Sequence, residues 1–237
     1  MNASARSVPP APPALPPASA SAHTVLSYAV EVAKRAPSAH NTQPWAPRVL
    51  EHSIELGVTP ARTLPAADPT SRDLLLALGA WVECVAIAAN ACGHQIMVET
   101  LPDLARLEEF PVTGEADVTR PVLRISLASP DDALPIRPLP DGAANVPFSR
   151  FTPQDVAQRA TFRGELARHE SVFSTIEDPA AQIDLPPWLS LREVDPIAMR
   201  RLRQLGTWFT FARPEVTLEL IRWLRFTPRT PDYTRDG

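Results

Sequence analysis

Apolar residues recur at helical spacing in two stretches near the start of the chain. Residues 24–35 carry a broad apolar face, end in Lys34 and Arg35, and precede Pro37, which is typical of a helix and its end. Residues 74–91 are rich in leucine, alanine and valine and predict a longer helix that is buried on several sides. We expect Asp68-Pro69 to begin this helix and Gly93 to end it.

Shorter segments predict strands, and further helical patterns follow them. The expected strands are 45–50, 53–58, 95–101, 121–128 and, with a weaker pattern, 171–177. The expected helices are 153–169, one that begins at Asp195-Pro196 and one that begins at Pro214. Helices that alternate with an interrupted set of strands favour an α+β fold, a sheet flanked by helices.

The composition changes along the chain and predicts a tail followed by two modules. Residues 1–22 are mostly alanine, serine and proline, which cannot build a core and favour a disordered tail. The P-x-x-P spacings there leave a ligand for an SH3-like domain as the alternative. Residues 129–150 are rich in proline and aspartate, which favours a domain boundary or a connector. We therefore expect a first module over 23–129 and a second over 130–237.

Bulk properties narrow the classes of partner. A net charge of -4 argues against a nucleic-acid binder, which relies on basic residues to displace counterions. We expect no membrane span, because no apolar run approaches the roughly 20 residues required, and no signal peptide, because the N-terminal residues lack a continuous apolar core. Cys84 and Cys92 stand about 12 Å apart along one predicted helix, too far for a disulfide. We expect a cytoplasmic protein with free thiols and no membrane partner.

No metal or phosphate motif is recognisable. The histidines outside the 36–45 segment are scattered without the spacing of metal ligands, so we expect no metal. The chain contains neither of the two glycine-rich phosphate-binding loops, G-x-G-x-x-G and G-x-x-x-x-G-K-[ST].

The segment between the first helix and the first strand carries the most chemistry. It reads A-P-S-A-H-N-T-Q-P-W from residue 36 to residue 45. Ser38, Asn41 and Gln43 can donate and accept hydrogen bonds, while Pro37 and Trp45 offer apolar surface. This combination suits a flat ring with a polar edge, such as a flavin.

An ordinary helix-to-strand turn remains the alternative for this segment. In that interpretation Asn41 tolerates a left-handed conformation, Ser38 forms a turn and Trp45 belongs to the core. Histidine is a common general acid or base, so such a role is conceivable for His40 beside a capping or solvent-facing one.

The segment resembles the A-P-S-x-x-N-x-Q-P-W loop of the nitroreductase superfamily of flavin enzymes. The chain is most similar to the duplicated, Acg-like branch, in which two nitroreductase modules share one polypeptide. Supporting matches are residues 68–76 (D-P-T-S-R-D-L-L-L) with Leu78-Gly79-Ala80, and a weaker one over 220–237.

The resemblance implies a nitroreductase-like sheet and FMN bound where two modules meet. It assigns Pro37, Ser38, Asn41 and Gln43 to the cofactor, and Asn145 to the start of the second half, where the phosphate anchor belongs. It also implies NAD(P)H as electron donor, a nitroaromatic or quinone-like acceptor, and a homodimer. No catalytic side chain is assigned, because the cofactor performs the redox chemistry.

The chain departs from this pattern around Asn145. Alanines and a valine stand where relatives have arginines, which removes the strongest bidentate contact to a phosphate. We expect a shortened or degenerate member with an incomplete second module. Three functions stay open: an FMN-dependent oxidoreductase, a non-catalytic flavin-binding or sequestering protein, and a cofactor-free interaction module.

Overall fold

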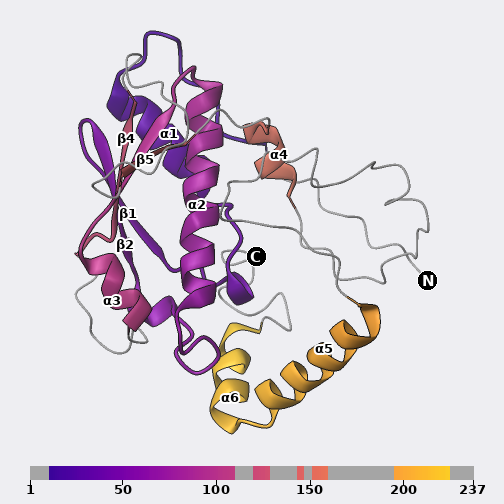
Figure 1. Ribbon diagram of the computed structural model, residues 1–237. Coiled ribbons are helices and arrows are strands. Elements are labelled where there is room, and N and C mark those ends of the chain that lie inside the picture. The colour runs from indigo at the N-terminus through magenta and orange to yellow at the C-terminus, as the bar shows by residue number, and fades with distance from the viewer. Residues whose placement is uncertain (1–10, 110–119, 129–142, 147–150, 160–194, 225–237) are drawn as a thin grey trace, which may run out of the picture. The chain divides into compact units, whose positions relative to one another are not determined.

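A computed structural model describes residues 11–109, 120–128, 143–146, 151–159 and 195–224 (Figure 1). The chain forms two compact units. One comprises Met1–Arg159 together with Glu215–Gly237, and the other comprises Ala160–Pro214.

The first unit is built on a five-stranded antiparallel sheet with the strand order β1-β2-β4-β3-β5. The strands are β1 (Trp45–Val49), β2 (Ser53–Val58), β3 (Ile96–Thr100), β4 (Leu123–Leu127) and β5 (Ala143–Val146). The first four confirm the predicted strands to within two residues. β5 was not predicted: its four residues lie in the segment interpreted as a connector, yet they pair with β3.

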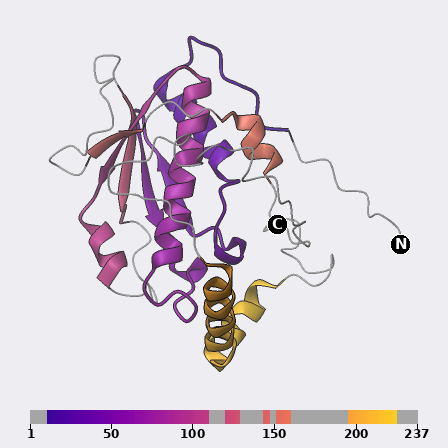
Figure 2. The same cartoon turned by 45° about the vertical axis from the view of Figure 1, so that its right-hand side comes forward.

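Two helices cover one face of this sheet, as both views show (Figures 1 and 2). They are α1 (Ala22–Ala33) and α2 (Arg72–Ala91), which also pack against each other. Alternate strand residues such as Ile54, Leu56 and Ile125 are buried in one hydrophobic cluster with both helices. This arrangement confirms the predicted α+β class.

The start of α2 differs from the prediction. The helix begins at Arg72, three residues after Pro69, because Ser71 takes a left-handed conformation with φ of 55° and interrupts the run. The carboxylate of Asp68 still caps the helix, since it accepts the N–H of Leu74 at 2.9 Å. At the other end Gly93 has φ of 83° and stops the helix as expected.

The prediction that no segment is long and apolar enough for a membrane span is wrong for helix α2. Its 20 residues pass that test of length and composition, but 56% of the apolar window is buried inside the protein. A core helix passes the same test, and α2 packs on α1 and the sheet.

The other face of the sheet carries a row of alternating charges. Arg48 on β1, Glu55 on β2, Arg124 on β4 and Glu99 on β3 lie side by side in register. Glu55 pairs with Arg48 and, at 3.3 Å, with Arg124, which also pairs with Glu99 at 3.1 Å. The hydrogen bond from Arg48 is the main reason that the pKa of Glu55 lies below its ordinary value.

The remaining helices fit the prediction in part. α3 (Asp103–Glu109) was not predicted. α4 (Pro153–Gln158) begins where the helix 153–169 was predicted and ends at Gln158, because Arg159 leaves the helical conformation; residues 160–169 of that prediction lie outside the described residues. α5 (Pro196–Phe211) and α6 (Pro214–Trp223) begin where predicted, and the Asp195 carboxylate caps α5. The predicted strand 171–177 lies outside the described residues. The predicted module boundaries remain predictions.

Candidate functional site

The segment between α1 and β1 has an unusual backbone. It contains a short 3-10 turn, η1 (Ala39–Asn41), and three of its non-glycine residues have positive φ: His40 (50°), Asn41 (55°) and Gln43 (51°). A left-handed conformation costs an L-residue about 1–2 kcal/mol. Such costs concentrate at ligand clamps and active sites, so this segment is a candidate site on backbone grounds alone.

The strained segment is held by hydrogen bonds within itself and by one from a second segment of the chain. The hydroxyl of Ser38 accepts the N–H of Gln43 at 2.9 Å, and the Ser38 carbonyl accepts the N–H of Asn41 at 3.0 Å. From a second segment, the guanidinium of Arg62 donates to the carbonyl of Thr42 at 2.9 Å. Trp45 is buried in the core where β1 begins. The turn and core roles considered for Ser38, Asn41 and Trp45 are therefore real features of this segment.

Two side chains of the segment remain available after these contacts. The amides of Asn41 and Gln43 are half-buried, and neither makes a side-chain hydrogen bond within the described part of the chain. Each amide offers one acceptor oxygen and two N–H donors. Pro37 and His40 are exposed. The backbone and the Ser38 hydroxyl therefore make hydrogen bonds within the segment, whereas the side-chain amides of Asn41 and Gln43 can bind other partners.

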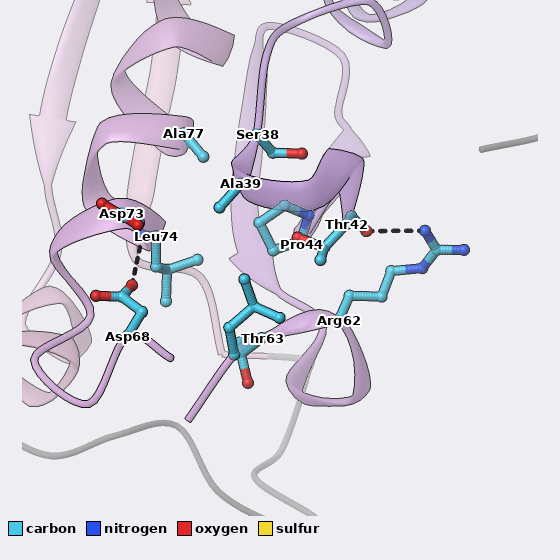
Figure 3. Close-up of a pocket in the computed structure, with 11 residues that line it drawn as sticks. Ser38, Ala39, Thr42, Pro44, Arg62, Thr63, Asp68, Asp73, Leu74 and Ala77 are labelled. Atoms are coloured by element: carbon cyan, nitrogen blue, oxygen red, sulfur yellow. Dashed lines mark hydrogen bonds between the residues drawn. The ribbon is translucent and has the colours of Figure 1, made fainter. Parts of the chain in front are cut away.

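A shallow hollow lies beside this segment (Figure 3). It has a volume of about 230 Å³, including the part that opens to solvent. Three stretches of chain form it: the 38–44 segment, residues 62–64 after η2 (Pro60–Arg62), and the start of α2. Its lining residues are Ser38, Ala39, Thr42, Pro44, Arg62, Thr63, Leu64, Asp68, Asp73, Leu74 and Ala77.

Asn145 lies elsewhere. It stands on β5 opposite Met97, at the sheet edge farthest from β1. Four strand spacings of roughly 4.8 Å put about 19 Å between these edges. The structure therefore brings Pro37, Ser38, Asn41 and Gln43 into one loop and does not bring Asn145 to it. All five remain predictions as cofactor ligands.

Sequence reasoning missed part of the hollow. Arg62, Thr63 and Leu64 come from a turn with no recognisable motif, and only the fold brings this turn to residue 42. Asp68 was predicted to begin the helix, and both Asp68 and Asp73 lie in the 68–76 match, but neither was predicted to line a site. Within the described ranges no three His, Cys, Asp or Glu side chains gather as metal ligands. Burial raises the pKa of the Cys84 thiol to about 11, so this cysteine carries no thiolate at neutral pH.

Comparison with known proteins finds relatives that match this chain in part. Three come from Mycobacterium tuberculosis strain H37Rv. "Putative NAD(P)H nitroreductase Rv3131" is 42% identical over 80 residues, which cover 34% of this chain and 22% of the relative. "Putative NAD(P)H nitroreductase acg" is 38% identical over 79 residues, covering 33% and 24%. "Uncharacterized protein Rv3127" is 36% identical over 98 residues, covering 37% and 28%.

These matches confirm the resemblance to the nitroreductase superfamily over about a third of the chain. No protein-family model matches the chain. The matched region spans less than a third of the length of each of these curated relatives.

Proposed function

We propose that the 37–44 segment and its hollow bind the isoalloxazine ring of FMN, and that the protein is an NAD(P)H-dependent oxidoreductase. The observation that carries this proposal is the pair of amides on Asn41 and Gln43. They belong to a strained, well-anchored segment and have no partner among the described residues. Their neighbours Ser38, Thr42 and Pro44 line the hollow, and the two amides themselves lie outside its lining. The partial similarity to proteins named NAD(P)H nitroreductases supports it.

The hydrogen-bonding groups and apolar surface of these residues match those of a flavin ring. The polar edge of the ring alternates carbonyl and N–H groups, which side-chain amides match because they both donate and accept. The Ser38 hydroxyl can donate its hydrogen while its oxygen accepts the N–H of Gln43. Ala39, Pro44 and Leu74 supply apolar surface in the hollow. The anchored backbone lowers the ordering cost of binding.

The hollow holds only part of such a ligand. Sites that enclose a drug-sized molecule usually measure about 300–1,000 Å³, and this hollow is smaller even with its open part included. The ring would therefore rest on this surface by one edge or face. We propose that the opposing surface comes from the second module or from a second copy of the chain, as in a homodimer.

The chemistry belongs to the cofactor. When bound, FMN accepts a hydride from NAD(P)H and passes electrons to an acceptor, which we propose to be a nitroaromatic or quinone-like compound. Asn41 and Gln43 would hold the polar edge of the ring and so set its orientation. Asp68 and Asp73 line the same hollow, and their like charge would disfavour the phosphate of FMN there, so that only the ring would enter it.

An FMN titration of the full chain, followed by quenching of flavin fluorescence, tests the binding. We expect saturable binding by the wild type and at least tenfold weaker binding by Asn41→Ala and by Gln43→Ala. His40→Ala is the matched control, because His40 is an exposed residue of the same segment that carries no side-chain amide. Equal affinity in all four proteins would overturn the assignment of the amides.

NAD(P)H oxidation by the FMN-loaded protein tests the activity. Turnover with a nitroaromatic or a quinone supports an oxidoreductase. Retained flavin without turnover would instead favour a sequestering protein, and a folded chain that takes up no FMN would favour an interaction module.

A further inference from the structure

Helix α6 carries a carboxylate on its inward face. Val216 and Glu219 are buried, with 1% and 9% of their surface exposed, and Leu220 and Trp223 continue the same face at helical spacing. Leu218 points the other way and is 61% exposed. An acid within an otherwise apolar inward stripe is costly unless hydrogen bonds compensate the charge.

Two backbone groups compensate it. The carboxylate oxygens of Glu219 accept the N–H of Ala66 at 3.1 Å and the N–H of Ala67 at 2.9 Å. Hydrogen bonds to an ionised acceptor are about twice as strong as neutral ones. α6 and the 64–68 segment belong to the same compact unit, although about 150 residues of sequence separate them.

The 64–68 segment in turn forms one wall of the hollow. Leu64 and Asp68 stand at its two ends, and both line the hollow. Asp68 also accepts the N–H of Leu74, a third lining residue, at the start of α2 (Figure 3). Hydrogen bonds therefore join α6 to residues 66 and 67, and the next residue along the chain, Asp68, is hydrogen-bonded to the start of α2.

We propose that Glu219 is a positioning residue that holds the 64–68 wall in the shape required for cofactor binding. This inference rests on the proposed function, and it makes the flavin affinity of the N-terminal site depend on a carboxylate near the C-terminal end. Without Glu219 the N–H groups of Ala66 and Ala67 lose this acceptor, and the wall loses two hydrogen bonds to α6. Glu219 does not itself line the hollow.

Amide hydrogen exchange in the full chain without flavin tests the structural half. We expect the Ala66 and Ala67 amides to exchange at least tenfold faster in Glu219→Ala, with a smaller effect in Glu219→Gln, which keeps one acceptor oxygen. Leu218→Ala, on the exposed side of the same helix, should match the wild type. Unchanged exchange in both Glu219 variants would overturn the proposal. If Glu219→Ala does not fold, Glu219→Gln decides.

FMN titration below the melting temperature of every variant tests the functional half. We expect at least tenfold weaker binding by Glu219→Ala, partial rescue in Glu219→Gln, and wild-type affinity in Leu218→Ala. A Glu219→Ala protein that melts earlier but binds FMN normally would show a merely structural role and overturn the inference. A wild-type chain that binds no FMN would overturn the proposed function, while the exchange result would still decide whether Glu219 holds the wall.

Discussion

The helix-covered sheet and the 38–43 segment differ in backbone conformation and in how their polar groups are paired, although they are adjacent in the chain. In the sheet and in α1 and α2, apolar side chains are buried and the backbone adopts regular conformations with regular hydrogen bonds. In the 38–43 segment three residues are left-handed, and two side-chain amides have no partner within the described residues. Of the four left-handed non-glycine residues in the described part of the chain, three therefore lie in this one segment.

This contrast separates stability from binding. Residues of the core stabilise the fold and offer nothing to a ligand, whereas the strained segment costs stability and presents groups that only a ligand would satisfy. Substitutions in the two regions should therefore change different measurements.

The largest effect should come from the core. Leu26, fully buried in α1, loses packing against the rest of the hydrophobic cluster when replaced by alanine. We expect Leu26→Ala to lower the free energy of unfolding in urea by about 2–5 kcal/mol. Leu76→Ala on the exposed side of α2 should change it by less than about 0.5 kcal/mol. A similar loss in both variants would contradict the layer arrangement.

Ser38→Ala should affect both measurements. The substitution removes the acceptor of the Gln43 N–H, which should cost about 0.5–1.5 kcal/mol of unfolding free energy. It also frees the residue that carries one of the two amides, so FMN affinity should fall at least tenfold. Stability is followed in urea and affinity by flavin fluorescence. A stability loss without any change in affinity would separate the segment's shape from flavin binding.

His40→Gly should raise stability. Glycine relieves the left-handed cost of about 1–2 kcal/mol but adds about 0.5–1 kcal/mol of backbone entropy to be lost on folding, so the net gain lies between about 0 and 1.5 kcal/mol. Leu76→Gly, within a regular helix, should instead destabilise the protein. Thermal melts of both variants check the opposite signs. A destabilised His40→Gly variant would mean that the segment is not strained at this residue.

The smallest effect should come from the charged face of the sheet. Because the pKa of Glu55 is lowered in the folded protein, its contribution is present above the unfolded pKa of about 4.3 and is lost as the pH falls through the lower folded value. The difference in unfolding free energy between wild type and Glu55→Gln should therefore shrink between pH 6 and pH 3. Glu51→Gln, at an exposed turn, is the control. A difference independent of pH would contradict the ion-pair assignment.

The regular elements could be predicted because their patterns are local. Alternation marked β2, and Gly93 marked the end of α2, since each signal lies within a few residues of its consequence. β5 has no such signal: Ala143–Val146 becomes a strand only through its pairing with β3. The start of α2 was missed because the left-handed Ser71 overrides the favourable Asp-Pro pair.

The candidate site divides in the same way. The 36–45 segment could be found because its polar and aromatic residues stand together in the sequence. Residues 62–64 and the 64–68 wall could not be predicted as part of the site. They reach the hollow only through the fold, by long-range contacts such as the hydrogen bond from Arg62 to the carbonyl of Thr42. Glu219 carried one available signal, an acid on the apolar face of a predicted helix, which marks either a misassigned face or a buried partner.

The absorbance spectrum of the purified full chain, recorded before and after addition of FMN and removal of the unbound excess, tests the central claim most directly. We expect a flavin band near 450 nm that stays with the wild-type protein and is lost in the Asn41→Ala, Gln43→Ala double variant at unchanged folding. A folded wild-type protein that retains no flavin, or a double variant that retains it fully, would contradict the assignment of this segment to the cofactor-binding site.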